Sequence, residues 1–293
     1  MTHAEAVARV REIQAAEQEQ ELNPVCGYRL LDQGRRTERA IVLVHGFTTC
    51  PKMYEQLAAE LAKTGANIVI PRLPHHGLAD RMTDDLAHLS VTEMAATTSE
   101  ALDIAAGLGE KVTVAGLSLG GILAAWLAQF RPGVDRAVVI APLFSIPVVP
   151  EWSSDLLGFI ADKAPNFYIW WDWKAKAHPP GPPYGYPRFP SHAYGEMLKL
   201  AHEVKSTARR EAPRSAGDIR VVVNLADPAV NNVATSRVVD AWRRHGASVR
   251  TYDFPRELGL GHDIVSPEQP YARTDVTHPV LLDWITAEVP SAG

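Results

Sequence analysis

The sequence has few of the features that mark disulfide-stapled or membrane-spanning proteins. Only two of its 293 residues are cysteines, Cys26 and Cys50, so disulfides cannot form the framework of the fold and a packed core is expected. Two cysteines fit a reducing compartment, although the sequence leaves open one bond between them. The longest nearly apolar stretch, residues 137–149, is interrupted by prolines and is shorter than the roughly 18 residues typical of a membrane span. No membrane span is expected.

The sequence also lacks an excess of basic residues. Its net charge is −5, spread along the chain, so it has no basic stripe of the kind that nucleic-acid binding requires. Residues 1–22 are rich in Ala, Glu and Gln and contain no apolar run or small-residue cleavage site, which argues against a secretory signal. They predict a short surface helix in an N-terminal extension, residues 1–25. A cytoplasmic protein without nucleic-acid partners is expected.

What the sequence does contain is a regular alternation of strand and helix patterns. The strand runs lack polar alternation, as is typical of strands covered by helices on both faces. This predicts an α/β fold with a mostly parallel central sheet, its core formed by residues 26–142 and 213–293. The strands are predicted at residues 39–44, 67–71, 111–117, 136–141, 219–225 and 248–254, and the main helices at residues 91–107, 119–130, 230–245 and 275–288.

Residues 143–212 break this alternation. Ten of the 22 prolines lie between Pro142 and Pro190, a density that is incompatible with long regular elements. The same stretch holds four tryptophans, which need a surface to pack against or a ligand to contact. We therefore expect an insertion packed on the sheet domain, with helices at residues 153–161 and 191–206, whose aromatic rings partly face a substrate pocket. The candidate substrate-binding residues are Trp152, Trp170, Trp171 and Trp173.

The most informative motif is Gly116-x-Ser118-x-Gly120, which lies between a predicted strand and a predicted helix. Such a strand–turn–helix element is typical of a nucleophile elbow, because the glycines permit a tight turn that exposes the serine hydroxyl at a helix N-terminus. Ser118 is the candidate nucleophile. The alternative is a serine that only caps a helix.

A serine nucleophile needs a base and an acid from later strand ends. His262, in a glycine-flanked loop after the last predicted strand, is the candidate base, and the alternative is a loop histidine that stabilises a turn. Asp227 follows the carboxyl end of its strand and is the candidate acid, unless it is simply an Asp-Pro turn residue. Asp253 and Asp263 are competitors, but the first lies within a strand and the second is adjacent to the base.

The predicted oxyanion hole uses two backbone amides. One is the N–H of Leu119, the residue after the nucleophile, and the other is the N–H of Phe47 in the loop after the first parallel strand. Gly46 permits the turn that aims this amide inward. His45 is expected to fix the loop by hydrogen bonding rather than to act on substrate.

Four motifs in this order resemble the α/β-hydrolase superfamily, and most of all its bacterial carboxylesterases and monoacylglycerol lipases. The motifs are residues 45–48, 116–121, 225–228 and 261–263. The resemblance implies an α/β-hydrolase fold, the triad of Ser118, Asp227 and His262, and a lid formed by residues 143–212. It also implies a Gly-His-Gly turn where this chain reads Pro74-His75-His76-Gly77, a departure that affects loop geometry more than chemistry.

The sequence therefore predicts a serine hydrolase that cleaves small-molecule carboxylic esters with short to medium acyl groups, monoacylglycerol-like ones among them, through an acyl-enzyme. No cofactor is expected. No metal is expected either, because His75 and His76 lack a third ligand at a fixed spacing. Thioesterase, amidase, aminopeptidase and carbon–carbon hydrolase activities use the same triad and stay open, as do a binding protein without turnover and the oligomeric state.

Overall fold

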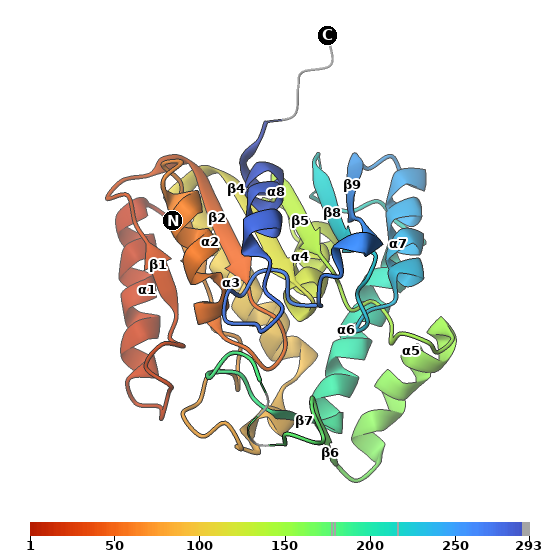
Figure 1. The fold of residues 1–293 in the computed structure, drawn as a ribbon. Coiled ribbons are helices and arrows are strands. Elements are labelled where there is room, and N and C mark those ends of the chain that lie inside the picture. Colours follow the sequence, from red (N-terminus) through yellow and green to blue (C-terminus); the bar gives the residue numbers. More distant parts are fainter. Residues whose placement is uncertain (177, 179, 216, 289–293) are drawn as a thin grey trace.

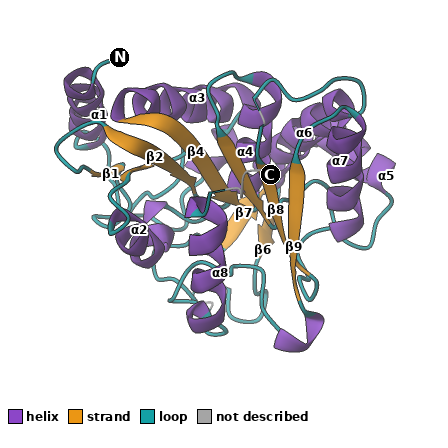
Figure 2. Cartoon of the chain, turned by 90° about the horizontal axis from the view of Figure 1, so that it is seen from above, coloured by secondary structure: helices purple, strands orange, loops and turns teal. Residues whose placement is uncertain are grey.

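The computed structural model describes residues 1–176, 178, 180–215 and 217–288. Within them, a seven-stranded sheet has the order β1-β3-β2-β4-β5-β8-β9 and lies between two layers of helices (Figures 1 and 2). Every neighbouring pair is parallel except β1 and β3, so the mostly parallel sheet predicted from the sequence is confirmed. The strands are β1 (Arg29–Leu31), β2 (Thr37–Val44), β3 (Asn67–Ile70), β4 (Gly109–Leu117), β5 (Arg136–Ile140), β8 (Ile219–Asn224) and β9 (Val249–Phe254).

Two hydrophobic cores, one on each face, hold the helices against this sheet. Along β2, Ile41 and Leu43 point to the face covered by α2 and α8, whereas Val42 and Val44 point to the face covered by α3 and α4 (Figure 2). Both sets of side chains are fully buried, which explains why the strand sequences lack polar alternation. The helices of the two layers are α1 (His3–Glu17), α2 (Glu55–Ala62), α3 (Val91–Leu108), α4 (Leu119–Phe130), α7 (Asn232–Arg244) and α8 (Thr274–Thr286).

Helix α1 is the helix predicted near the N-terminus, and it is more than a surface appendage. Its first turn is closed by a capping box, in which the Thr2 hydroxyl accepts from the Glu5 N–H and the Glu5 carboxylate accepts from the Thr2 N–H. Ala6 and Val10 are buried against the core beside α3. One face of α1 therefore contributes to the packing of the sheet domain.

Residues 143–212 form the segment predicted as an insertion, with helices close to both predicted positions. Helix α6 (Ser191–Ala208) packs on α4, and α5 (Glu151–Ile160) packs on α6. Between them runs the antiparallel pair β6 (Tyr168–Trp170) and β7 (Arg188–Pro190), which the sequence did not predict. The outer side of α5 leaves several large apolar side chains in contact with solvent, namely Trp152, Leu156, Leu157, Phe159 and Ile160.

Cys26 and Cys50 form a disulfide between the segment before β1 and the loop after β2. This is the bond that the sequence left open. Because disulfides persist mainly in oxidising compartments, the pair gives no support to the predicted cytoplasmic location. None of the helices in the described ranges combines the length and apolar character needed to cross a membrane.

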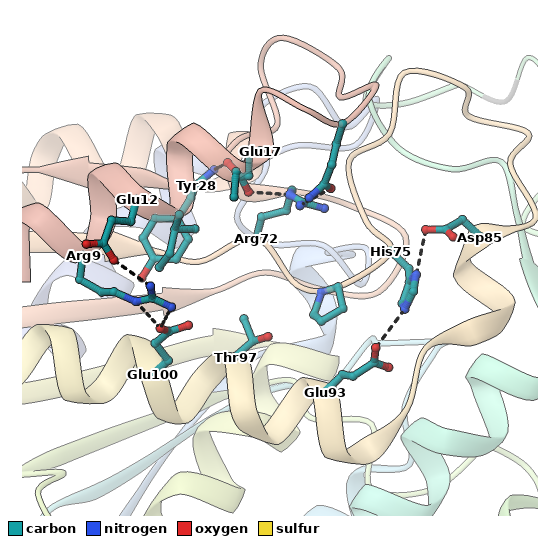
Figure 3. Close-up of a pocket in the computed structure, with 14 residues that line it drawn as sticks. Arg9, Glu12, Glu17, Tyr28, Arg72, His75, Asp85, Glu93, Thr97 and Glu100 are labelled. Atoms are coloured by element: carbon teal, nitrogen blue, oxygen red, sulfur yellow. Dashed lines mark hydrogen bonds and ion pairs between the residues drawn. The ribbon is translucent and has the colours of Figure 1, made fainter.

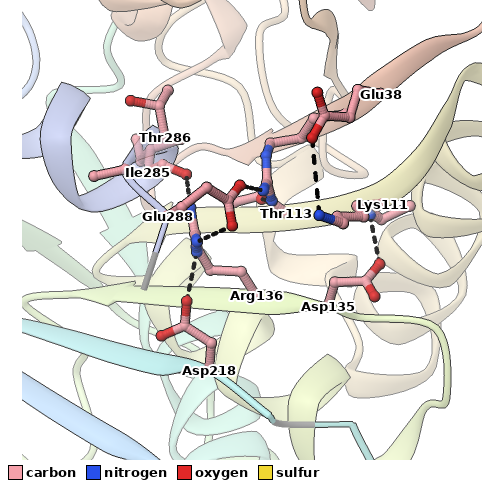
Figure 4. Close-up of polar contacts among 12 residues, drawn as sticks. Glu38, Lys111, Thr113, Asp135, Arg136, Asp218, Ile285, Thr286 and Glu288 are labelled. Atoms are coloured by element: carbon pink, nitrogen blue, oxygen red, sulfur yellow. Dashed lines mark hydrogen bonds and ion pairs between the residues drawn. The ribbon is translucent and has the colours of Figure 1, made fainter. Parts of the chain in front are cut away.

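A buried ion-pair network closes the amino edge of the sheet (Figure 4). Asp218, just before β8, binds the guanidinium groups of Arg136 and Arg220, with Nε–Oδ2 distances of 2.7 and 3.0 Å. The same two arginines donate to backbone carbonyls at the end of α8, those of Ile285 and Trp284. The network therefore fastens α8 to β5 and β8, at the edge opposite the carboxyl ends of these strands.

Candidate active site

Ser118 occupies the turn between β4 and α4. Its backbone has φ 59° and ψ −112°, a region that residues with a side chain rarely adopt. The turn is held in place because the Ser118 N–H donates to the Ile140 carbonyl at the end of β5, with an N–O distance of 2.9 Å. This is the strained strand-to-helix turn expected from the motif, and it places Ser118 at the carboxyl edge of the sheet.

The two glycines of the motif are needed because the backbone segments approach too closely for side chains. A Cβ atom on Gly116 would lie 2.1 Å from the carbonyl oxygen of Gly120. A Cβ atom on Gly120 would lie 1.9 Å from the carbonyl oxygen of Val44 in β2. Both distances are far below van der Waals contact, so only glycine allows α4 to begin so close to β4 and β2.

The candidate base and the candidate acid are in direct contact. His262, in the loop after β9, has its Nδ1 atom 2.7 Å from Oδ2 of Asp227, which follows β8. The Asp227 side chain is fully buried, and its Oδ1 accepts from the Ala229 N–H. A carboxylate only accepts, so the Nδ1 atom carries the proton. That tautomer leaves Nε2 of His262 as a proton acceptor.

The competing carboxylates have other surroundings. Asp253 is an exposed residue of β9, paired in register with Val223. Asp263 is buried, and its side chain accepts from the N–H groups of Val265 and Ser266 and from the amide of Gln269. Among these candidates, only Asp227 contacts His262.

Ser118 and His262 line one cavity of about 340 Å³. Its wall also includes Phe47, Arg81 and Trp171. Among the described residues, no hydrogen bond joins the Ser118 hydroxyl to the His262 ring. Such contacts are often long in an enzyme without substrate and tighten when the substrate binds.

The two backbone amides predicted as an oxyanion hole are available to donate hydrogen bonds to a ligand. Within the described parts of the chain, neither the Phe47 N–H nor the Leu119 N–H donates a hydrogen bond. The neighbouring amide of Gly46 is used differently, since it donates to the Met53 sulfur at 3.4 Å. Leu119 opens α4, so its amide also lies at the positive end of the helix dipole.

His45 fixes the loop after β2, as its position suggested. The ring is fully buried, accepts from the Leu73 N–H through Nε2 and donates from Nδ1 to the Gly46 carbonyl. Burial lowers the pKa of His45 to about 4, because the charged imidazole would lose its hydration. A neutral His45 therefore connects this loop to the loop after β3.

The loop after β2 is also tied to residues 143–212. The indole N–H of Trp171 donates to the Thr48 hydroxyl at 2.9 Å, and the Tyr186 N–H donates to the Thr48 carbonyl at 2.8 Å. Trp171 is the one of the four predicted tryptophans that lines the cavity. Trp170 is half-buried beside Arg188, and Trp152 and Trp173 are 69% and 70% exposed. Sequence reasoning missed Arg81, because it lies in an irregular loop without a pattern that fixes side-chain direction.

A second hollow lies between α1, α3 and the loop after β3 (Figure 3). Its charged side chains are already paired, for example Arg9 with Glu100 and His75 with Asp85, as the dashed lines show. His76 points elsewhere, with Nδ1 on the Pro74 carbonyl. In the part of the chain that the structure describes, no three metal-ligating side chains come together.

Comparisons with known proteins bear on the family and the fold of the chain. The family model described as "Alpha/beta hydrolase family" matches residues 41–275. A thermostable monoacylglycerol lipase of Bacillus sp. (strain H-257) is 31% identical over 109 residues, which are 37% of this chain and 42% of the lipase. The match thus spans less than half the length of that relative.

Solved structures agree on the fold. The structure from a study of the metagenome-derived lipolytic enzymes LipS and LipT has a TM-score of 0.67 at 18% identity, covering 89% of this chain and 96% of its own. The monoacylglycerol lipase of Paleococcus ferrophilus has a TM-score of 0.64 at 19% identity, covering 88% and 97%. At such identities the likeness concerns the arrangement of the elements.

Proposed function

Because the chain belongs to the alpha/beta hydrolase family, we propose that it is a serine hydrolase that cleaves carboxylic esters through an acyl-enzyme. The observation that carries the proposal is the contact between Asp227 and His262, because His262 lines the same cavity as Ser118. The three residues lie in the loops after β4, β8 and β9, which meet at the carboxyl edge of the sheet. A serine that only capped a helix would need neither a paired histidine nor a strained backbone.

The first half of the reaction forms the acyl-enzyme. The Ser118 hydroxyl attacks the ester carbonyl while Nε2 of His262 takes its proton, and Asp227 stabilises the resulting imidazolium. The negative charge on the former carbonyl oxygen is bound by the N–H groups of Phe47 and Leu119. As the tetrahedral intermediate collapses, the carbon–oxygen bond to the alcohol breaks and His262 protonates the leaving oxygen.

The second half returns the enzyme to its starting state. A water molecule attacks the acyl carbonyl, and His262 accepts its proton in the same way. The bond to Ser118 then breaks, its oxygen regains the proton from His262, and the carboxylic acid leaves. Every proton is carried by this chain's own residues, so the proposed mechanism requires no cofactor.

The size of the cavity supports short to medium acyl groups as substrates. Its volume of about 340 Å³ lies at the lower end of the range for small-molecule sites. The segmental likeness to a monoacylglycerol lipase adds monoesters of glycerol as a substrate class to test. Long-chain triacylglycerols are expected to be poor substrates.

A fluorophosphonate probe and a substrate panel test the proposal. We expect covalent labelling and ester hydrolysis by the wild type and loss of both in Ser118→Ala, because only the hydroxyl makes the attack. The panel contains 4-nitrophenyl esters, thioesters and anilides of graded acyl length, which separates esterase from thioesterase and amidase activity. Wild-type turnover by Ser118→Ala, with the mutation verified by mass spectrometry, contradicts the mechanism.

A further inference from the structure

The cavity that Ser118 and His262 line also contains a cation, Arg81, which has no anionic partner among the described residues. Arg81 lines this cavity, and its Nε–H donates to the carbonyl oxygen of Gly185 at 2.7 Å. Among the described residues, the bond to Gly185 is the one hydrogen bond of the Arg81 side chain, and no carboxylate oxygen lies within 4.0 Å of its guanidinium nitrogens. Neither Nη atom is among the buried polar atoms that lack a partner, so both reach accessible space.

Other half-buried or buried arginines among the described residues are paired with carboxylates. Arg72 binds Glu17 at 2.6 Å, Arg188 binds Asp84 at 2.8 Å, and Arg136 binds Asp218 at 2.7 Å. Burial lowers the pKa of Arg81, and no nearby carboxylate offsets this effect. An arginine stays charged at neutral pH nevertheless, so the cavity contains an uncompensated positive charge.

The carboxylates in the wall of the cavity are engaged with their own loops. Asp172 accepts through Oδ1 from the N–H groups of Lys174 and Ala175. Asp263 accepts three hydrogen bonds from its own loop, as described above. The described residues of the cavity wall therefore supply no anionic partner for Arg81, whereas a ligand in the cavity could.

We propose that Arg81 binds a carboxylate or phosphate group carried by the ester substrate, an inference that rests on the proposed ester hydrolysis. The Gly185 carbonyl accepts from Nε of the guanidinium, so the two Nη groups remain available to a ligand. Together they form a planar pair of donors whose geometry matches that of a carboxylate or phosphate. A neutral substrate of the same shape leaves this charge unpaired. Arg81 would therefore select anionic esters over neutral ones.

Two pairs of substrates test this selection, each differing only by the charged group. The first is the 4-nitrophenyl monoester of adipic acid against its methyl-capped counterpart. The second is 1-butyrylglycerol 3-phosphate against 1-butyrylglycerol. The first pair carries the anion on the acyl side as a carboxylate, and the second carries it on the alcohol side as a phosphate, so the pairs distinguish the two sources of the anion.

The measured quantity is the ratio of kcat/KM for the anionic and the neutral member of a pair. We expect Arg81→Gln to lower this ratio about ten- to one hundredfold in at least one pair, mainly through KM, as for loss of a charge-assisted hydrogen bond. Arg81→Lys keeps the charge and should restore part of the ratio. Arg244→Gln is the matched control, because Arg244 is an exposed residue of α7 that does not line the cavity. A ratio within twofold of wild type in both pairs overturns the proposal.

A binding measurement separates this proposal from the proposed hydrolysis. In Ser118→Ala, calorimetric titration with the anionic member of each pair reports binding without turnover. Weaker binding in Ser118→Ala/Arg81→Gln supports the role of Arg81 even if the wild type cleaves neither ester. Equal binding by the single and double variants, both with native circular dichroism, overturns it even if ester hydrolysis by Ser118 is established.

Discussion

The two edges of the sheet each contain a carboxylate that faces basic side chains, but the two sites are built differently. At the amino edge, Asp218 accepts from Arg136, which also donates to the Ile285 carbonyl of α8 (Figure 4). Arg220 likewise donates to Asp218 and to the Trp284 carbonyl of α8. At the carboxyl edge, Asp227 contacts one histidine, and the histidine keeps one nitrogen free to accept a proton. The first arrangement is complete within the protein, whereas the second is completed by a substrate in the proposed mechanism.

This difference separates residues that stabilise the fold from residues that the proposed mechanism uses for catalysis. At the amino edge, burial alone would raise the pKa of Asp218, but hydrogen bonds from Arg220 and Arg136 outweigh it and hold that pKa at about 2. At the carboxyl edge, Ser118 is strained, and the amides of Phe47 and Leu119 have no acceptor among the described residues. Strain and unsatisfied donors persist only where the rest of the fold is stable enough to hold them.

Of the two changes of charge that compare the edges, the one at the carboxyl edge is expected to have the larger effect on rate. Asp227→Asn should lower kcat by about 10⁴-fold, because the amide favours the wrong tautomer of His262 and no longer stabilises its charged form. The midpoint of thermal unfolding should change little. The measurement is ester hydrolysis together with a melting curve, and Asp253→Asn is the control. Greater damage from Asp253→Asn would assign the acid to that residue.

The same substitution at the amino edge should act on stability instead. Asp218→Asn leaves Arg136 and Arg220 buried without their counter-charge, which typically costs about 3–5 kcal/mol of unfolding free energy. Chemical denaturation measures this loss, and kcat per folded molecule should remain close to that of the wild type. A variant with unchanged stability and impaired turnover would contradict the division of roles between the edges.

Sequence reasoning reached the carboxyl edge because its chemistry is encoded locally. The glycines around Ser118 mark the turn directly, and Asp227 and His262 each follow a strand by a few residues. The parallel order of the strands then places their ends at one edge. The predicted mostly parallel α/β sheet was correct because uninterrupted apolar runs specify strands covered on both sides. The α/β-hydrolase fold that the resemblance of the four motifs implied was also correct.

The parts that the sequence did not predict depend on tertiary contacts. Strand β1 is only three residues long and pairs with β3 as an antiparallel edge strand, so it has no periodic pattern. Arg81 reaches the cavity through an irregular loop. Trp171 and Trp173 are two positions apart, yet one lines the cavity and the other is mostly exposed. Neighbouring aromatics in an irregular segment carry no signal that distinguishes them.

Acid should affect the two edges over different pH ranges. Burial lowers the pKa of His45 to about 4, so between about pH 6.5 and 4 the unfolded state binds a proton that the folded state does not. Stability should fall across that interval, by up to about 3 kcal/mol for this group. Asp218 acts in a lower pH range, because its ion pairs favour the charged carboxylate in the folded state. Its lowered pKa stabilises the fold above about pH 4, and this stabilisation is lost as the pH falls towards 2.

Urea unfolding at a series of pH values measures both contributions. His45→Asn should flatten the slope between about pH 6.5 and 4, whereas Asp218→Asn should leave that slope and flatten the fall below about pH 4. The comparison uses slopes rather than absolute stabilities, so it remains valid if either variant is destabilised overall. Equal slopes for His45→Asn and the wild type would show that another group, such as the buried His76, dominates this range.

The smallest effects are expected within residues 143–212, where the contrast lies between two tryptophans. Trp171 lines the cavity and binds the Thr48 hydroxyl, so Trp171→Ala both widens the site and releases a contact to the loop after β2. We expect a shift of up to about tenfold in kcat/KM towards longer acyl groups, as is typical of adding a few carbon atoms of space to an apolar site. Trp173→Ala removes an equally large ring that does not line the cavity, and it should change this preference less than twofold. Esters of two to twelve acyl carbons provide the measurement. A preference unchanged from that of the wild type in both variants would assign residues 143–212 a covering role. A shift in Trp173→Ala as large as that in Trp171→Ala would mean that the Trp173 ring reaches the substrate after this segment moves.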